Sequence, residues 1–157
     1  MRGKQAPKRV INPDPKYNRI DVAKFINYIM IGGKKITAQK IIYRAFDIIK
    51  EKTKEEGVEV FEKAFVKVGP TVEVRGRRVG GANYQVPFPV RESRKFTLAS
   101  RWIIAAAKAI KGKDMAEKIA DILIQSINNE GPAIKKKEDV HRMAESNKAF
   151  AHFAKFG

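Results

Sequence analysis

Cysteine is absent from the sequence, and its absence excludes disulfide bonds and thiol chemistry. Histidine is nearly absent, because His141 and His152 are the only two. A zinc site needs three or four ligands, and no carboxylate pattern accompanies these histidines, so we expect no bound metal ion. Long hydrophobic runs are missing as well, which argues against a membrane-spanning segment and against a secretory signal. We therefore expect a chain that works in the cytoplasm, without a membrane partner.

Motifs that bind a cofactor or perform catalysis are also missing. The stretch GGKK at residues 32–35 has the glycine and lysine of a phosphate-binding loop. That motif, however, needs an earlier glycine where Tyr28 stands and a hydroxyl residue where Lys35 stands. Carboxylates lie mostly among lysines at helical spacing, as exposed ion pairs do, and no pair of a general acid and a general base stands out. We predict no catalytic residue, no cofactor and no enzymatic activity.

Acidic residues are too few to balance the basic ones. The 157 residues include 33 Lys and Arg but only 17 Asp and Glu, which leaves a net charge of +16. The excess is concentrated, because residues 1–19 hold six basic and one acidic residue and residues 71–95 hold six and two. A merely solvated surface would not require such clustering, so the pattern predicts a polyanionic partner, above all a nucleic acid.

The hydrophobic pattern predicts a mainly α-helical protein. Residues 1–19 lack hydrophobic periodicity and carry prolines among basic residues, so we expect a basic, extended arm that becomes ordered on its partner. Residues 20–157 are expected to form a single helical domain, a bundle of about six helices. Capping residues, glycines and prolines put these helices at about 20–33, 35–52, 58–68, 92–111, 114–130 and 137–150, with the final residues fraying.

Between the third and fourth helices, at residues 71–91, apolar and polar residues alternate on both sides of two adjacent glycines. This pattern predicts a two-stranded β-hairpin with a two-residue turn, projecting from the helices. Its register would place Arg77 opposite Tyr84 and Arg75 opposite Val86. One face of the hairpin would then combine guanidinium groups with an aromatic ring, and nucleic-acid bases can stack on both.

Four groups of basic residues are candidates for binding the nucleic acid. They lie in the arm, in the loop after the first helix, in the hairpin with the helix that comes after it, and at residues 135–142. For any single residue a solvated surface charge is an equally good explanation, whereas the hairpin group as a whole is a stronger case. The candidates are Arg2, Lys4, Lys8, Arg9, Lys34, Lys35, Arg75, Arg77, Arg78, Arg91, Arg94, Lys95, Arg101, Lys108, Lys135, Lys136, Lys137 and Arg142.

Three classes of function remain open at this level. The first is an RNA-binding scaffold, in which phosphate contacts from several basic groups fix the arrangement of RNA helices. The second is a DNA-architectural protein that inserts a ribbon and an arm into a minor groove. The third is an enzyme that modifies or hydrolyses RNA, and it would require reactive groups that the sequence does not offer.

Three segments resemble a known family, the bacterial type of small-subunit ribosomal protein seven. They are NPDPKY with the subsequent GKK and IIYRA, then PTVEVRGRRVGGANYQVP, and last KKKEDVHRMAESNKAFAH. Departures are Gly76, where the family often has Ser, then Phe88 and Pro89 in place of a more polar pair, and the ending AKFG. They leave open the individual contacts of the hairpin tip and the tail.

The resemblance implies a bundle of six helices with a β-ribbon between the third and fourth. It implies a monomer within the ribosome that binds the 3′ major domain of small-subunit ribosomal RNA and nucleates assembly of the head. The ribbon and the last helix would lie near the exit-site transfer RNA and messenger RNA. Small-subunit ribosomal proteins nine and eleven would be neighbours.

Overall fold

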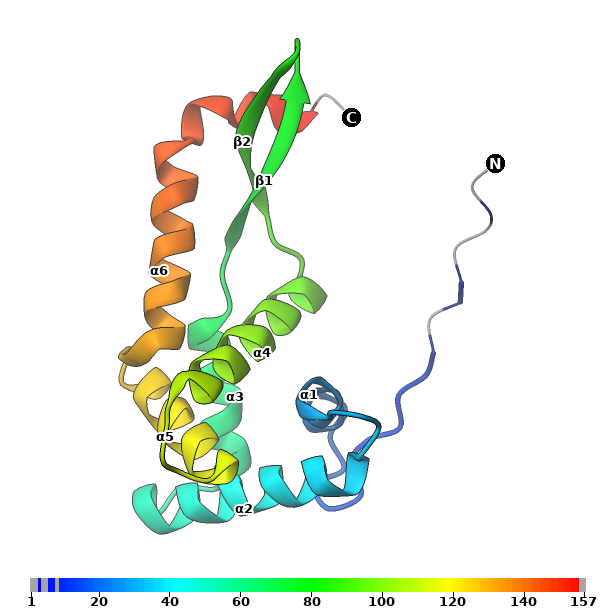
Figure 1. Cartoon of the computed structure of the whole chain (residues 1–157), viewed down its shortest axis with the longest axis vertical. Coiled ribbons are helices and arrows are strands. Elements are labelled where there is room, and N and C mark those ends of the chain that lie inside the picture. Colours follow the sequence, from blue (N-terminus) through cyan, green and yellow to red (C-terminus); the bar gives the residue numbers. More distant parts are fainter. Residues whose placement is uncertain (1–2, 4–5, 8, 156–157) are drawn as a thin grey trace. The chain divides into compact units, whose positions relative to one another are not determined.

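The computed structural model describes residues 3, 6–7 and 9–155 of the chain (Figure 1). The chain divides into two compact units, residues 1–40 and 41–157. In the described part, the elements in chain order are α1 (Ile20–Ile29), α2 (Lys35–Thr53), α3 (Gly57–Val68), β1 (Val72–Val79), β2 (Ala82–Pro89), α4 (Glu92–Ala109), α5 (Met115–Ile127), α6 (Gly131–Ser146) and the 3₁₀-helix η1 (Lys148–Lys155). The prediction of a mainly helical chain with a hairpin between the third and fourth helices is confirmed.

The first unit contains α1 and the start of α2. The helix α1 ends at Ile29, earlier than predicted, because Met30 leaves the helical conformation with a ψ of 133°. Beyond it, Gly32 and Gly33 adopt left-handed φ angles of 59° and 73°, which glycine reaches at no steric cost. These two glycines therefore shape the loop that leads into α2.

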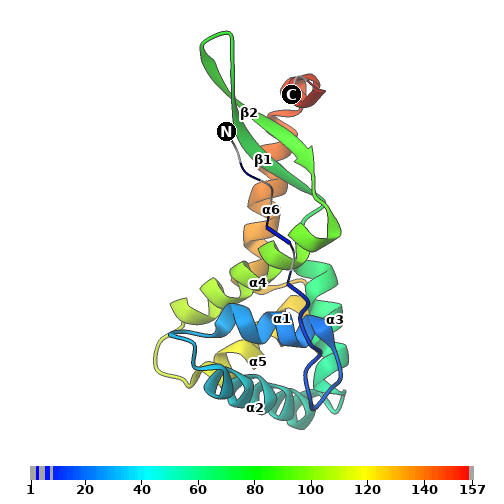
Figure 2. The same cartoon turned by 90° about the vertical axis from the view of Figure 1, so that its right-hand side faces the viewer.

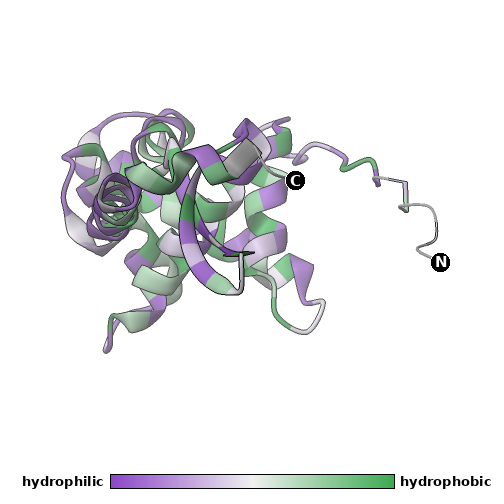
Figure 3. Ribbon diagram, turned by 90° about the horizontal axis from the view of Figure 1, so that it is seen from above, coloured by the Kyte–Doolittle hydropathy of each residue, from purple (hydrophilic) through white to green (hydrophobic). Residues whose placement is uncertain are grey.

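In the second unit, the helices are amphipathic, and Figure 3 shows both hydrophilic and hydrophobic residues on them. Four aromatic rings pack in a row that joins three helices. Phe46 of α2 lies 5.7 Å from Phe61 of α3, Phe61 lies 4.3 Å from Phe65, and Phe65 lies 4.9 Å from Phe96 of α4, measured between ring centroids. Such pairs add stability beyond the apolar area that they bury, so this row anchors the base of the hairpin.

The β-hairpin has the predicted register, with Val79 opposite Ala82 and Arg77 opposite Tyr84. Its turn is of type I′, because Gly80 and Gly81 both have positive φ angles, 59° and 88°. The hairpin lies beside α6 (Figures 1 and 2), and α6 contacts both strands. The residues after α6 form η1, which packs on β2.

Two expectations about the C-terminal region were wrong. The last long helix begins at Gly131 instead of near residue 137, because Pro132 stands in its first turn, where a missing N–H costs no hydrogen bond. The described residues after it form η1, and Phe150 and Phe153 both pack against Tyr84 of the hairpin, whereas the predicted fraying of residues 156–157 lies outside the described residues. The 3₁₀-helix η1 is thus attached to the ribbon.

Candidate nucleic-acid interface

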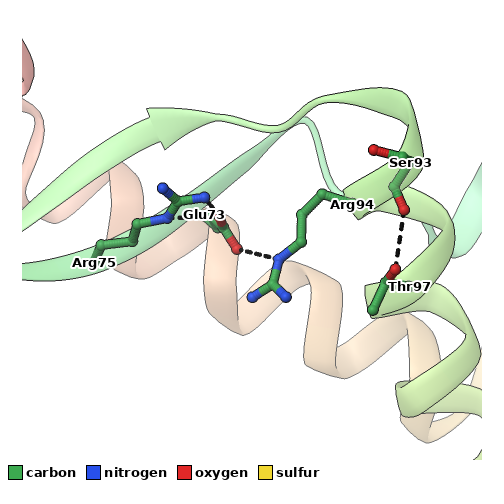
Figure 4. Close-up of polar contacts among 5 residues, drawn as sticks. All are labelled: Glu73, Arg75, Ser93, Arg94 and Thr97. Carbon is green, nitrogen blue, oxygen red and sulfur yellow. Dashed lines mark hydrogen bonds and ion pairs between the residues drawn. The ribbon is translucent and has the colours of Figure 1, made fainter. Parts of the chain in front are cut away.

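A buried carboxylate lies between two arginines where the hairpin meets α4 (Figure 4). Glu73 of β1 is only 6% exposed. Its Oε1 accepts a hydrogen bond of 2.8 Å from Nε of Arg75 and a second bond from Nη2 of the same residue, and its Oε2 accepts one of 3.1 Å from Nε of Arg94. We call these three residues the Glu73 cluster. It joins β1 to the first turn of α4.

Electrostatics keep the carboxylate of this cluster ionised. Burial alone would raise the pKa of Glu73, but the hydrogen bonds from Arg75 and Arg94 and their positive charges outweigh it, and the pKa is lowered from its ordinary value. The two guanidinium side chains are 57% and 42% exposed. One negative charge is therefore hidden, while two positive charges face solvent.

A cleft of about 540 Å³ opens beside the Glu73 cluster. The end of β2 and the start of α4 form its wall, so three arginines and a serine surround it. The guanidinium carbon of Arg75 also lies 5.3 Å from the ring centroid of Phe88, a cation–π contact. Its lining residues are Arg75, Phe88, Pro89, Val90, Arg91, Ser93 and Arg94. The cleft has the chemistry of an anion site.

Farther along the hairpin, part of the predicted stacking face is used inside the protein. Nη1 of Arg77 donates a hydrogen bond of 2.6 Å to the backbone carbonyl of Phe153. The ring of Tyr84 lies 5.1 Å from each of the rings of Phe150 and Phe153. Arg78, next to the turn, is exposed. Of this group, Arg78 is thus the residue most accessible to a partner.

The candidate residues on α4 and α6 have different environments. Arg91, Arg101 and Lys108 are exposed, and so are Lys135, Lys136 and Arg142. Lys95 donates a hydrogen bond of 2.5 Å to Glu92, and Arg142 lies 3.3 Å from Asp139. Lys137 differs, because it is half-buried and its Nζ donates a 2.6 Å hydrogen bond to the carbonyl of Lys67. Its contact is structural.

The remaining candidates belong to the first unit. Arg9, Lys34 and Lys35 are exposed, and the backbone N–H of Lys35 bonds the carbonyl of Gly33 at 2.8 Å, which fixes the loop before α2. Three further residues of the arm, Arg2, Lys4 and Lys8, lie outside the described residues.

Sequence reasoning missed Glu73, because a lone acidic residue among valines offers no periodic signal. Its one usable sign is that Glu73 and Arg75 stand two positions apart in a strand, on the same face. No group of three His, Asp or Glu residues suited to a metal ion occurs in the described part of the chain. Among the described helices, none combines the length and the hydropathy needed to cross a membrane.

Comparisons with known proteins agree with these features. The family described as ribosomal protein S7p/S5e matches residues 1–148. The small ribosomal subunit protein uS7 of Thermotoga petrophila is 58% identical over 153 residues, which cover 98% of this chain and 99% of that relative. The protein of the same name from Fervidobacterium nodosum is 56% identical with the same coverage. That from Caldanaerobacter subterraneus is 57% identical over 147 residues, 94% of each chain.

Proposed function

Because the chain belongs to the ribosomal protein S7p/S5e family, we propose that its basic faces bind the 3′ major domain of small-subunit ribosomal RNA and nucleate assembly of the head. The chain is a structural protein of the small ribosomal subunit, not an enzyme, and it binds ribosomal RNA within the cytoplasmic ribosome. Its function therefore depends on which of its surfaces contact that RNA.

The observation that carries the proposal is the basic cleft between the hairpin and α4. Arginine forms two parallel hydrogen bonds with a phosphate, and an ordered arginine loses less conformational freedom on binding than a mobile one. The exposed Arg101 and Lys108 continue the positive charge along α4. Phosphates of one RNA helix can therefore bind at the cleft and along α4. The other basic groups of the protein can then bind neighbouring RNA helices.

The other basic groups extend the proposed RNA face. The arm and the loop at Lys34 and Lys35 would contact further RNA helices, which suits a junction better than a single duplex. The hairpin turn and α6 would lie near the exit-site transfer RNA and messenger RNA. Small-subunit ribosomal proteins nine and eleven would be protein neighbours. Exposed Arg78 at the turn, and Lys135 and Lys136 on α6, support such contacts.

Binding to a transcript of the 3′ major domain tests the proposal. We expect tight binding at about 0.15 M salt that weakens steeply as salt rises, because phosphate contacts release counterions. Duplex DNA should compete poorly, since a shape-specific RNA site is not reproduced by a straight duplex. Equal affinity for an unrelated RNA of the same length would overturn the proposal, and effective competition by duplex DNA would favour a DNA-architectural protein.

A pair of variants locates the RNA face. Arg91→Gln with Arg101→Gln should reduce the slope of log affinity against log salt by about one to two units, one for each lost phosphate contact. The matched control is Lys50→Gln with Lys63→Gln. It also removes two positive charges, but from lysines that form ion pairs with Glu56 and Glu55. The control should leave that slope nearly unchanged.

A further inference from the structure

A negative charge inside an RNA-binding face requires an explanation, because it repels phosphate. Glu73 lies where the hairpin meets α4, and both of its carboxylate oxygens accept hydrogen bonds from arginines that line the basic cleft. If the carboxylate only neutralised these arginines, it would weaken RNA binding. Its hydrogen bonds also fix the orientation of both guanidinium groups, and this effect can strengthen RNA binding.

We propose that Glu73 is a positioning residue, which holds Arg75 and Arg94 as a pair of guanidinium groups that clamp one phosphodiester of the RNA backbone. This inference rests on the proposed function and gives it a specific subsite. The ligand is a phosphodiester group of folded RNA, and Arg91 and Ser93 supply further donors from the rim of the cleft.

The N–H donors of the two arginines that do not bind Glu73 suit this ligand. Glu73 accepts hydrogen bonds from Nε and Nη2 of Arg75 but only from Nε of Arg94. A guanidinium has five N–H donors, so Nη1 of Arg75 and both Nη atoms of Arg94 remain for a second acceptor. In Figure 4 the Nη atoms of Arg94 point away from the carboxylate. An anion in the cleft can therefore be bound without breaking the cluster.

The net charge at the cleft and the fixed position of Arg75 agree with this assignment. Three arginines line the cleft, and the buried carboxylate of Glu73 pairs with two of them, so the Glu73 cluster and Arg91 together carry a net charge of +2. Arg75 is held from two directions, because Phe88 stacks near its guanidinium while Glu73 binds its edge. A long arginine side chain is otherwise free to sample many rotamers, and fixing it in advance removes that entropic cost from binding.

The test compares two variants that make the same change in charge. Glu73→Gln and Glu92→Gln each remove one negative charge from the region where the hairpin meets α4. Glu92 is 87% exposed and pairs with Lys95, outside the Glu73 cluster. Long-range electrostatics alone predicts tighter RNA binding for both variants. A positioning role predicts that E73Q binds the 3′ major domain transcript about tenfold more weakly, as when one or two charge-assisted hydrogen bonds lose their geometry. E92Q should bind as tightly as the wild type or more tightly.

A second comparison separates positioning from a general loss of structure. In a background of Arg75→Gln with Arg94→Gln, the further change E73Q should not weaken RNA binding, because the residues through which Glu73 acts are gone and only the repulsion of its negative charge is left to lose. A further loss in that background would overturn the inference. If E73Q does not fold at the assay temperature, Arg75→Lys with Arg94→Lys decides. This variant keeps the charge but removes the fixed planar groups. Affinity equal to that of the wild type would then overturn the inference.

Failure of the inference and failure of the proposed function give different results. Wild-type protein that does not distinguish the 3′ major domain from other RNA overturns the proposed function. Selective wild-type binding together with E73Q binding as tightly as the wild type overturns only the positioning role of Glu73. Selective binding with a loss for E73Q and none for E92Q supports both.

Discussion

Nη1 of Arg77 in β1 donates a 2.6 Å hydrogen bond to the carbonyl of Phe153, so one side of the hairpin is joined to η1. The aromatic contacts of Tyr84 lie on the adjacent strand, opposite Arg77 in the register. Together these contacts attach η1 to the ribbon.

Replacing Tyr84 tests this attachment. Tyr84→Ala removes the ring that contacts both Phe150 and Phe153, and each aromatic pair contributes about 0.5–1.5 kcal/mol beyond its buried area. Backbone amides of residues 148–153 should therefore exchange with solvent about tenfold faster or more. Tyr84→Phe keeps the ring and should exchange like the wild type. Equal exchange in all three proteins would show that the ring does not hold η1.

Lys137 and Lys136 are neighbours with different expected roles. Lys137 donates to the carbonyl of Lys67 near the C-terminal end of α3, so Lys137→Ala should lower the free energy of unfolding by about 1–2 kcal/mol. It should change RNA affinity little. Lys136 is exposed, so Lys136→Ala should weaken RNA binding and change the free energy of unfolding little, in the same denaturation and binding measurements. A fully stable K137A with weakened RNA binding would contradict the structural role.

His141 links α6 to the start of the hairpin and should make stability depend on pH. Its Nε2 accepts a 3.2 Å hydrogen bond from the backbone N–H of Thr71, which requires this nitrogen to be unprotonated. Burial and then the charge of Lys137 lower the pKa of His141 from its ordinary value. The unfolded chain therefore binds a proton more readily. The contribution of His141 to stability is complete above the unfolded pKa of about 6.5 and is lost as the pH falls toward the folded pKa.

Urea denaturation between pH 7.5 and 5 measures this dependence. His141→Gln keeps an acceptor but cannot titrate, so its free energy of unfolding should fall less with decreasing pH than that of the wild type. His152→Gln removes the other imidazole from the exposed surface of η1 and provides the matched control. Parallel curves for H141Q and the wild type would exclude His141 as the source of the slope.

Gly57 lies where α2 and α3 approach each other closely. A Cβ atom at this position would lie 2.6 Å from Cβ of Phe46 and 2.7 Å from its backbone, so Gly57→Ala must displace main chain. We expect a loss of about 2–4 kcal/mol in the free energy of unfolding, within the range of severe overpacking. Gly76→Ala is the control, because its nearest contact is 4.0 Å away, at the flexible end of Gln85. Equal melting temperatures of the two variants would contradict the close approach.

Local pattern was enough to predict the hairpin and most of the helices. The register came from alternation around Gly80 and Gly81, since a two-residue turn leaves no freedom in strand pairing. The helices α2, α3 and α5 came from apolar residues at helical spacing. The start of α6 did not, because Pro132 is compatible both with the end of one helix and with the first turn of the next.

The details of the candidate interface depend on contacts that sequence spacing does not reveal. Lys137 resembles its neighbours in sequence, and only the nearby carbonyl of Lys67 distinguishes it. Glu73 pairs with Arg94, which is 21 positions away. Tyr84 was predicted to face a nucleic acid, and its packing against Phe153 depends on where the last residues return in space. These are tertiary contacts, so residue propensities and hydrophobic periodicity do not predict them.

The contacts of the hairpin differ in sequence separation, and this sets the order in which they can form during synthesis. Glu73 and Arg94 are 21 residues apart, whereas Thr71 and His141 are 70 apart and Arg77 and Phe153 are 76 apart. Shorter loops close at a lower entropic cost and form first. A nascent chain therefore assembles the arginine cleft while the aromatic face of Tyr84 is still uncovered, and the arrival of the last residues completes the ribbon.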